Sequence, residues 1–445
     1  MTDNSFKRVL IIGQPFNNYS GGGITLTNLF RGWPRDKIAV VSTGHLLQNI
    51  SFDVCNLYYQ LGREEQFWMF PFSVLQKSFP SGPQTFKIQE TPVQTRVKTS
   101  IRKVLVDRIF FPVIQWIGLF HCLSKITLSQ RLIDWLSDYK PEVLYLQIST
   151  REQIIFSQQL IDHLNIPTAL HMMDDWPSTI SNDGLFKEYW RKKIDKEFRQ
   201  LLDRIDLCLS ISNAMSSEYL KRYKREFMAF HNSIDISKYL KAKKSNYKLG
   251  KTFRILYIGR IGTANKHSIY FFANAISNIR IDPFEIYLDI ISNDINSSKS
   301  GPIEKVRNVR ILPPVDHKVV PDLLHTYDLL FLPLDFTETG LKFARYSMPT
   351  KASEYFASGT PVLVFAPKET AISKFCSMNE CGFCITEQSQ ERIENAVQFL
   401  IRNEDQRQIL SANAVRLAKE LFSAEIVGGK FHQILINTSK NKKYV

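Results

Sequence analysis

The chain has 445 residues, which is too long for one compact hydrophobic core and fits two α/β domains of about 200 residues each. Hydrophobic content of 44% and charged content of 22% are ordinary for a globular protein and argue against intrinsic disorder. The formal net charge of +14 predicts a negatively charged partner: phosphates of a small substrate, an anionic membrane surface or nucleic acid.

The first residues run directly into an apolar strand pattern, without the layout of a signal peptide, and no run of 18 uncharged apolar residues occurs. We therefore expect a cytoplasmic protein. The nearest approach to a membrane segment is 104–126, which Asp107, Arg108 and Pro112 interrupt. Its basic N-terminal flank and aromatic residues would suit the inner face of an anionic membrane, and a core helix of the first domain is the alternative.

The first half of the chain alternates short apolar runs with helical patterns, which predicts a parallel sheet covered by helices. Its first strand ends at a glycine and leads through a glycine-rich loop into a helix. Strands are expected at 7–13, 38–43, 141–147, 166–176 and 206–212.

A polar, lysine-rich segment at 237–252 predicts a linker, after which the alternation restarts. Ligands of such sheets bind beyond the C-terminal ends of the strands, so two Rossmann-like domains, 1–236 and 253–425, are expected to face each other across a cleft. The last residues, 426–445, form a closing helix and tail. Strands of the second domain are expected at 253–260, 286–292, 309–315, 328–334 and 361–366.

Three of the six cysteines lie close together in sequence: Cys376, Cys381 and Cys384. A Cys-x-x-Cys spacing can indicate redox chemistry or half of a zinc site, but a thioredoxin-like context and a fourth ligand are both missing nearby. We expect reduced thiols and no bound metal.

A glycine cluster, Gly21, Gly22 and Gly23, precedes the first helix. Glycines allow close backbone approach and a helix N-terminus attracts an anion. The spacing is neither that of a dinucleotide fingerprint nor that of a P-loop, and an ordinary flexible loop would explain the cluster equally well.

Two cations follow the first strand of the second domain. Arg260 ends that strand and Lys266 lies at a predicted helix start, so together they suit a pyrophosphate. Solvated surface cations are the alternative, because most Lys and Arg side chains are exposed.

A third candidate site opens a later helix, for which Pro349 suits the first turn and Ser347 is a plausible cap. Lys351 and Glu354 then lie on one helix face. The lysine and the helix dipole would attract phosphate, and the carboxylate could accept hydrogen bonds from ribose hydroxyls. A plain Lys–Glu pair within the helix is the alternative.

In this order and spacing, the features resemble glycosyltransferases of the GT-B fold, most closely the family-4-like group of bacterial polysaccharide and lipid-linked glycan enzymes. The resemblance covers nearly the whole chain and rests on the Gly21–Gly23 loop and on the motifs SISNAMSSEYL, HNSIDISKY, YIGRIGTANKHS, LPPVDHKVVPDLLHTYDLLFLPL, PTKASEYFASGTPVLVF and VRLAKELF.

The resemblance implies a nucleoside-diphosphate sugar as donor, no further cofactor, and a glycan or lipid-linked acceptor. It also implies that the C-terminal helix returns to the first domain. By matching positions it assigns roles as follows: the backbone of Gly22 and Gly23 faces donor phosphate and acceptor, Arg260 and Lys266 hold the diphosphate, the stretch at Pro314 and Val315 holds the base, and Glu354 holds the ribose.

Two positions depart from the family pattern. Many members carry a second glutamate eight residues before the ribose glutamate, where this chain has Tyr346, and Lys351 could replace part of its contact with the sugar. One extra residue also separates Arg260 from Lys266. The expected stereochemistry, retaining or inverting, therefore stays open.

Catalytic candidates lie at the polar end of the fourth strand: His171, Asp174 and Asp175. In direct displacement one of them would deprotonate the acceptor hydroxyl. In a retaining reaction they would orient hydroxyls while a diphosphate oxygen takes the proton. A divalent ion held by the three is a further alternative, and for His171 a structural role is nearly as plausible.

Two other functions stay open at this point. An epimerase acting on nucleotide sugars would use the same fold with extra carboxylates in the cleft. A basic nucleic-acid-binding protein would show a continuous basic stripe with interleaved aromatic residues, whereas the basic residues here are scattered, so no nucleic acid is expected as a partner.

Overall fold

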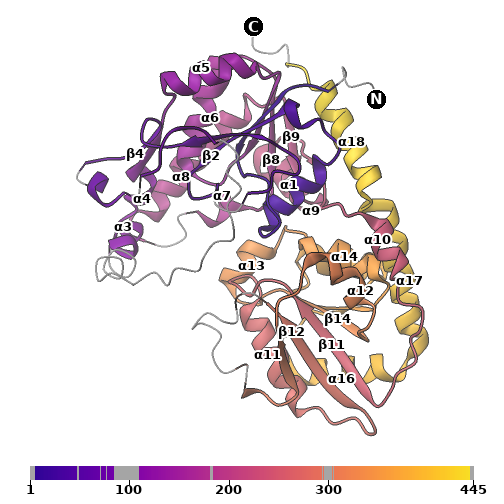
Figure 1. Cartoon of the computed structure of the whole chain (residues 1–445). Helices are drawn as coiled ribbons and strands as arrows, with labels where there is room; N and C mark the ends of the chain where they lie inside the picture. The colour runs from indigo at the N-terminus through magenta and orange to yellow at the C-terminus, as the bar shows by residue number, and fades with distance from the viewer. Residues whose placement is uncertain are drawn as a thin grey trace. The chain divides into compact units, whose positions relative to one another are not determined.

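The computed structural model describes residues 6–47, 50–70, 72–76, 78–84, 110–180, 184–292, 294, 303 and 305–440. The chain divides into two compact units (Figure 1). Unit 1 comprises 1–210, 219–228 and 431–445, and unit 2 comprises 211–218 and 229–430. Both are α/β, as the alternating sequence pattern predicts.

Unit 1 is built on an eight-stranded sheet whose strands from β9 to β3 run parallel, with β5 antiparallel at the edge. The first strand is buried along its whole length, as its sequence VLIIG predicts. In spatial order the strands are β10 (Met228–Ala229), β9 (Leu207–Ser210), β8 (Thr168–Met172), β7 (Val143–Gln147), β1 (Val9–Gly13), β2 (Ile38–Thr43), β3 (Leu57–Leu61) and β5 (Gly82–Gln84).

The five strands expected in this half are confirmed, and β3, β5 and β10 were not foreseen. Hydroxyl caps start several of the helices, since Ser129 caps α5 and Thr150 caps α6. The helix α9 (Asn213–Tyr223) begins in residues of unit 2 and ends in unit 1. The helices before it are α1 (Gly21–Leu29), α3 (Phe111–Ile117), α4 (Phe120–Leu123), α5 (Gln130–Tyr139), α6 (Arg151–Leu164), α7 (Trp176–Thr179) and α8 (Lys187–Leu202).

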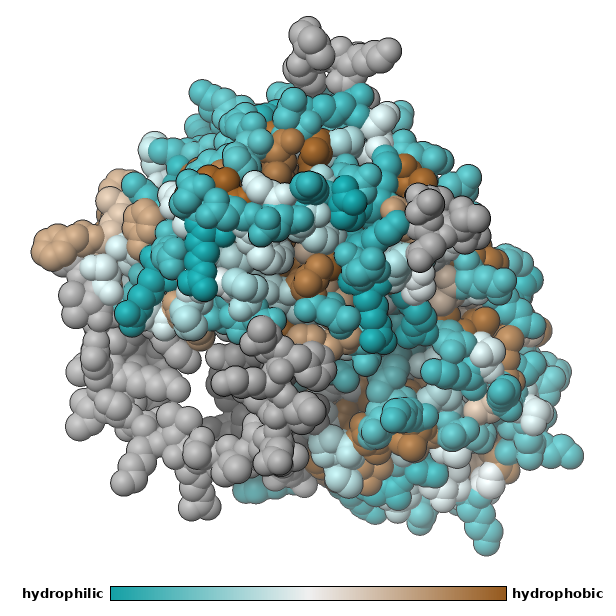
Figure 2. Space-filling model, turned by 45° about the horizontal axis from the view of Figure 1, so that its top comes forward, coloured by the Kyte–Doolittle hydropathy of each residue, from teal (hydrophilic) through white to brown (hydrophobic). Residues whose placement is uncertain are grey.

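The segment 104–126 is not one core helix. Residues 104–109 lie outside the described residues, and the rest forms α3, α4 and strand β6 (Ser124–Ile126), which pairs with β4 (Gln66–Trp68). Gly118, with φ of +80°, ends α3 in the left-handed conformation. Figure 2 shows hydrophobic surface at the left edge, on the side where Figure 1 places β4, α3 and α4.

The C-terminal helix α18 (Ala424–Asn437) begins in unit 2 and ends in unit 1, which confirms its expected return. Within unit 1, Phe431 packs edge-on against Phe30 and Tyr145. His432 Nε2 donates a hydrogen bond to the carbonyl oxygen of Leu29 at 2.9 Å.

Unit 2 contains a six-stranded sheet that is parallel throughout. All five strands expected here are confirmed, and β16 at the edge is the addition. In spatial order they are β13 (Val309–Leu312), β12 (Glu285–Ile291), β11 (Thr252–Ile258), β14 (Leu329–Pro333), β15 (Val362–Phe365) and β16 (Phe383–Ile385).

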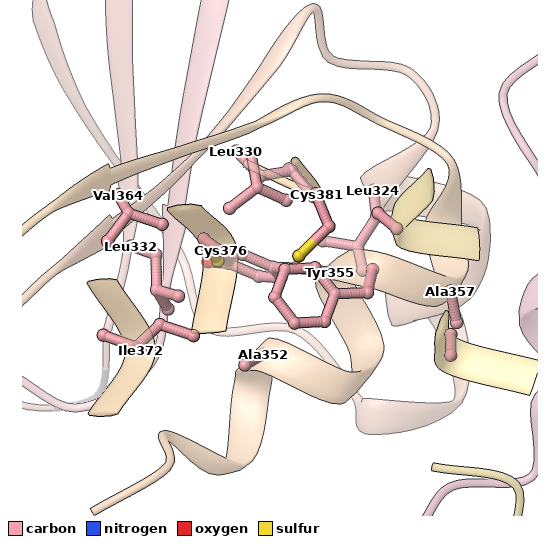
Figure 3. Packing of buried hydrophobic residues seen from close by; sticks show 14 of the residues in the cluster. Leu324, Leu330, Leu332, Ala352, Tyr355, Ala357, Val364, Ile372, Cys376 and Cys381 are labelled. Atoms are coloured by element: carbon pink, nitrogen blue, oxygen red, sulfur yellow. The ribbon is translucent and has the colours of Figure 1, made fainter. Parts of the chain in front are cut away.

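Hydrophobic residues of both faces of this sheet pack against helices. Figure 3 shows a core cluster to which α14 contributes Tyr355 and β14 contributes Leu330, with the Tyr355 ring next to Cys381 in this view. The helices of unit 2 are α10 (Ile236–Lys241), α11 (Lys266–Asn278), α12 (Val320–Leu324), α13 (Glu338–Ala344), α14 (Thr350–Ser358), α15 (Ala371–Asn379), α16 (Gln390–Arg402) and α17 (Glu404–Leu421).

The cysteine cluster lies within this core. Cys376 and Cys381 are fully buried, burial raises the pKa of Cys376, and all six cysteines of the chain are free thiols. Across the described residues, no group of three or more His, Cys, Asp or Glu side chains is placed to hold a metal ion.

The segment 237–252 is not a free linker but part of unit 2. Tyr239 of α10 is buried in the core of this unit. Lys244 is also buried, and its amine donates a hydrogen bond to the carbonyl oxygen of Tyr327 at 2.8 Å. A lysine-rich segment is usually exposed, because charged side chains are well solvated. Tyr239 and Lys244 are nevertheless buried, because the folded unit supplies contacts for both.

Candidate functional site

The loop after β11 is held in one conformation by a buried tyrosine. The Tyr257 hydroxyl donates to the carbonyl oxygen of Arg260 and accepts from Asn265 Nδ2, at 2.8 Å from the latter. Asn265 Nδ2 also donates to the Arg260 carbonyl at 3.0 Å, and its Oδ1 accepts from the Gly262 N–H at 2.9 Å. These hydrogen bonds therefore fix the backbone at Arg260 and at the start of α11.

Lys351 of α14 lies against this loop. Its amine is 4.1 Å from the centroid of the Tyr257 ring and lies 2.5 Å from the place a Cβ would take at Gly259. Gly259 has φ of +141°, a conformation that side chains rarely adopt, so both the backbone and the close lysine require glycine here. The structure thus brings together the Lys351 and Arg260 segments that the sequence separates by ninety residues.

The surroundings of Lys351 favour its neutral form. Desolvation by burial lowers the pKa of Lys351 to about 7, and the opposing charge of Glu354 only partly offsets this. A half-buried amine whose pKa lies near neutrality is typical of a functional site, and an anionic ligand suits this one. A phosphate placed beside it would restore the charged form.

The N-cap of the helix that carries Lys351 lies two residues later than the sequence indicated. Pro349 occupies the N-cap position, α14 starts at Thr350, and the Ser347 hydroxyl donates back to Phe343 instead of capping the helix. Asn232, in the motif HNSIDISKY, supports this turn, because its Nδ2 donates to the Thr350 carbonyl at 3.1 Å. Asn232 thus ties a motif remote in sequence to the first turn, but it does not cap the helix, because a cap accepts from backbone N–H groups.

Glu354, one turn further along α14, is held by two side chains that the sequence analysis missed. His317 Nε2 donates a hydrogen bond to Glu354 Oε1 at 2.8 Å, and the Tyr239 hydroxyl bonds the same carboxylate. The Glu354 side chain is 13% exposed and that of His317 is 61% exposed. The only sequence signal was that His317 lies two residues after Val315, in the stretch assigned to the base.

The His317–Glu354 contact makes a prediction about pH. This hydrogen bond to the carboxylate raises the pKa of His317 above its ordinary 6.5. Because the folded pKa is the higher one, the contact stabilises unit 2 fully below pH 6.5 and loses its effect as pH rises through the folded value. Replacing His317 with alanine should lower the melting temperature at pH 6 and leave it unchanged at pH 9, measured by circular dichroism.

The expected effect is below about 1 kcal/mol, because His317 is largely solvent-exposed. The exposed His163 in unit 1 provides a matched control, and His163→Ala should give no such pH-dependent difference. An equal loss for His317→Ala at both pH values would contradict the assignment of an ionic contact.

The other predicted donor residues of unit 2 lie at the same edge of the sheet, beyond strand ends. Arg260 is 75% exposed, with its Nε 3.6 Å from Asp294. Lys266 is the first residue of α11, as predicted, and its amine lies over the Tyr270 ring. Val315 is exposed in the loop after β13. The predicted donor residues thus lie at the C-terminal edge of the sheet, where parallel sheets bind their ligands.

In unit 1 the glycine loop opens α1, but its glycines differ in role. The Ser20 hydroxyl caps the helix by accepting from the Gly23 N–H at 3.1 Å. A Cβ at Gly23 would lie 2.3 Å from the Asn17 side chain, whereas Gly22 has only ordinary contacts. Packing and capping therefore explain Gly23 without a ligand.

His171 is a core residue in this structure, contrary to its expected catalytic role. It is fully buried on β8, with Nδ1 2.5 Å from the Tyr145 hydroxyl, and Tyr145 in turn packs against the C-terminal helix. Desolvation lowers the pKa of His171 to about 3. A base this weak and inaccessible is unsuited to deprotonating an acceptor.

The neighbouring aspartates have different environments. Asp175 is 3% exposed and forms a two-pronged ion pair with Arg222, at 2.8 and 3.0 Å, while the Tyr219 hydroxyl donates to it at 2.9 Å. Asp174, in contrast, is exposed at the surface. Asp175 thus has a structural role, and Asp174 is the accessible carboxylate of the three candidates.

A family model matches the part of unit 2 that carries this site. Residues 252–403, about a third of the chain, match the model described as Glycosyl transferases group 1. A search of curated proteins found no match. The matched range contains Arg260, Lys266, Lys351 and Glu354.

Solved structures resemble the whole chain. HepE from Anabaena, in a complex with UDP and glucose, is 12% identical with a TM-score of 0.61, over 97% of this chain and 100% of that one. Sucrose-phosphate synthase from Thermosynechococcus elongatus is 14% identical with a TM-score of 0.60, over 96% and 98%. WaaG, a glycosyltransferase of lipopolysaccharide biosynthesis, is 12% identical with a TM-score of 0.56, over 96% and 100%. These likenesses establish the GT-B fold.

Proposed function

We propose that this chain, a glycosyltransferase with the GT-B fold, transfers a sugar from a nucleoside-diphosphate sugar to a hydroxyl group of a glycan or lipid-linked acceptor. The observation that carries the proposal is the Lys351 amine held against Gly259, beside the loop of Arg260 and Lys266 and one helical turn from Glu354. Three cations and a carboxylate match the charges of a diphosphate and the hydroxyls of a ribose.

In the proposed reaction the bond between the anomeric carbon and the diphosphate oxygen breaks, and a bond to the acceptor oxygen forms. Lys351, Arg260 and Lys266 stabilise the negative charge that develops on the leaving diphosphate. Glu354, oriented by His317 and Tyr239, accepts hydrogen bonds from the ribose. The acceptor proton passes to the Asp174 carboxylate in direct displacement, or to a diphosphate oxygen if configuration is retained.

The similar solved structures indicate which nucleotide donor should be tested first. Solved structures of HepE contain UDP and UDP-glucose, which makes a uridine donor the first one to test. WaaG acts in lipopolysaccharide biosynthesis, which supports an acceptor in cell-surface glycan synthesis. The alternatives of an epimerase and of a nucleic-acid-binding protein are not favoured, because the matched family and these neighbours act in glycosyl transfer.

The test is a donor screen. The melting temperature is measured with UDP, GDP, ADP, CDP and dTDP, and hydrolysis of the corresponding sugar donors is then followed for each nucleotide that stabilises the protein. Stabilisation by one of these diphosphates and release of the sugar are the expected results. If none of the five raises the melting temperature, the proposal fails.

Glu354→Gln provides a more specific test of the nucleoside site. The amide keeps the size of the side chain but loses the charge, so binding of the stabilising nucleotide should weaken by roughly 1–3 kcal/mol. Isothermal titration calorimetry measures the difference, and Glu369→Gln, at an exposed position of the same unit, is the matched control. Unchanged affinity in Glu354→Gln would place the ribose elsewhere.

A further inference from the structure

Large apolar side chains of unit 1 are exposed together in one region. Phe70 is 86% exposed, Trp116 58% and Leu185 61%, and Phe120, Phe186 and Tyr189 are each about half exposed. We call these six residues the apolar patch. They come from the chain after β4, from α3 and α4, and from the start of α8. Isolated exposed apolar residues are common, but a contiguous group indicates an interaction surface.

Backbone and ring contacts join these segments. The Leu185 N–H donates to the Trp116 carbonyl at 2.7 Å, which ties the start of α8 to α3. Likewise the Met69 N–H donates to the Leu123 carbonyl at 2.9 Å, which ties the chain after β4 to α4. The patch is therefore one surface made of neighbouring segments.

A buried platform supports the patch from below. The Trp190 ring, 8% exposed, packs 5.3 Å from the His121 ring and from the guanidinium of Arg151. Arg151 is fixed by a two-pronged ion pair with Glu197, at 2.6 and 2.7 Å. The exposed rings of the patch gain no hydrophobic stabilisation while they face water, and would gain it only if another apolar surface covered them.

Basic side chains border the patch on α8. Lys187, Arg191 and Lys192 are exposed within one and a half turns, while the nearby acidic Glu188 is paired with Arg191 at 2.7 Å. The amine of Lys193 lies 5.6 Å from the centroid of the exposed Tyr189 ring. Among the residues that the structure describes, neither Lys187 nor Lys192 forms an ion pair. Aromatic side chains next to such lysines combine the two features that anionic lipid surfaces bind.

We propose that the apolar patch docks unit 1 on an anionic lipid bilayer, with Phe70, Trp116, Phe120, Leu185, Phe186 and Tyr189 in the interfacial layer and Lys187 and Lys192 on the headgroups. Aromatic rings with polar edges favour that layer. Among the described residues, no helix is both long and apolar enough to pass through a bilayer, so the contact lies at its surface. This inference goes beyond the transferase activity and does not depend on it.

A second copy of the chain is a less suitable partner. In a two-fold contact each patch meets its own copy, so the lysines of both α8 helices would approach one another. The chain as a whole carries a formal charge of +14, which adds to this repulsion. An anionic bilayer offers the opposite charge over the same area.

The test is sedimentation of the full chain with vesicles, without any sugar donor. Vesicles of phosphatidylcholine with 30% phosphatidylglycerol are compared with vesicles of phosphatidylcholine alone. The wild type should bind the anionic vesicles at least tenfold more strongly, and added salt should weaken the binding. Trp116 should also be quenched by brominated anionic lipid.

Two pairs of variants assign the binding to the patch. Phe70→Ser combined with Trp116→Ser should weaken binding by roughly tenfold or more, because two large side chains no longer enter the interface. Met378→Ser, 82% exposed on unit 2, is its control and should bind as the wild type. Lys187→Glu combined with Lys192→Glu should also lose roughly tenfold or more, and Lys419→Glu, exposed on α17, should lose little.

Three results would overturn the proposal: wild-type binding that does not distinguish the two vesicle types, patch variants that bind like the wild type, or a wild-type dimer that the patch variants convert to monomers. The last result would assign the patch to contacts between copies. Because donor is absent from the assay, failure here leaves the transferase proposal intact, and inactivity in the donor screen leaves this one intact.

Discussion

Replacement of Lys351 by methionine should abolish most sugar transfer while leaving the fold intact. Methionine keeps the packing of the aliphatic part of the side chain beside Tyr257 but removes the amine that lies against the bend at Gly259. Removing one fixed charge that stabilises a developing anion lowers kcat by about 10²–10³-fold. Steady-state kinetics with the donor found in the screen measure the loss.

The same variant should be at least as stable as the wild type. Desolvation of the amine lowers the pKa of Lys351 to about 7, which means that the charged amine destabilises the folded protein. Methionine removes that penalty, and its melting temperature should be equal or higher. Loss of activity with retained stability separates a functional lysine from a structural one.

The pH dependence of donor binding follows from the same pKa. In the free enzyme Lys351 is mostly charged at pH 6 and mostly neutral at pH 8, so affinity for a nucleoside diphosphate should fall as pH rises through about 7. The bound diphosphate favours the charged form, so binding at pH 8 should take up about one proton, which calorimetry in buffers of different ionisation enthalpy measures.

Lys374, exposed on α15 of the same unit, supplies the control for these experiments. Lys374→Met should keep both the activity and the pH profile of the wild type. If Lys351→Met is fully active, or if its pH profile is that of the wild type, the diphosphate does not bind beside Lys351.

Replacement of Asp175 by asparagine should destabilise unit 1 by about 3 kcal/mol. The change leaves Arg222 without its anion in a largely buried pair, and such losses run to about 3–5 kcal/mol. The lower end applies because Arg222 is 23% exposed and can be partly hydrated. All six tryptophans belong to unit 1, so denaturation in urea followed by tryptophan fluorescence reports this unit alone.

Asp174→Asn is the matched comparison at the adjacent position. Asp174 reaches solvent, so its replacement should change stability by less than about 0.5 kcal/mol. If it acts as general base, transfer should fall by roughly 10²–10⁴-fold. Similar stability losses for both variants would refute the division of roles, and a fully active Asp174→Asn would favour proton transfer to the diphosphate.

Much of this site could be anticipated from local sequence. Arg260, Lys266, Lys351 and Glu354 each follow a strand or open a helix whose pattern is visible in the chain. Parallel sheets bring such positions to one edge, so their gathering in unit 2 follows from the order of elements alone. Gly259, which the Lys351 amine contacts, lies at the end of the same predicted strand as Arg260.

The sequence by itself determined the two parallel sheets and the ten central strands, because each depends on periodicity that neighbouring residues carry. The return of the C-terminal helix was implied by the resemblance to GT-B glycosyltransferases. Only the tertiary structure decided which of two adjacent aspartates is paired, that His171 is buried against Tyr145, and that His317 and Tyr239 hold Glu354. These outcomes depend on contacts between residues far apart in the chain. A side chain's exposure, pKa and partners are properties of the packed unit, and one-dimensional spacing does not contain them.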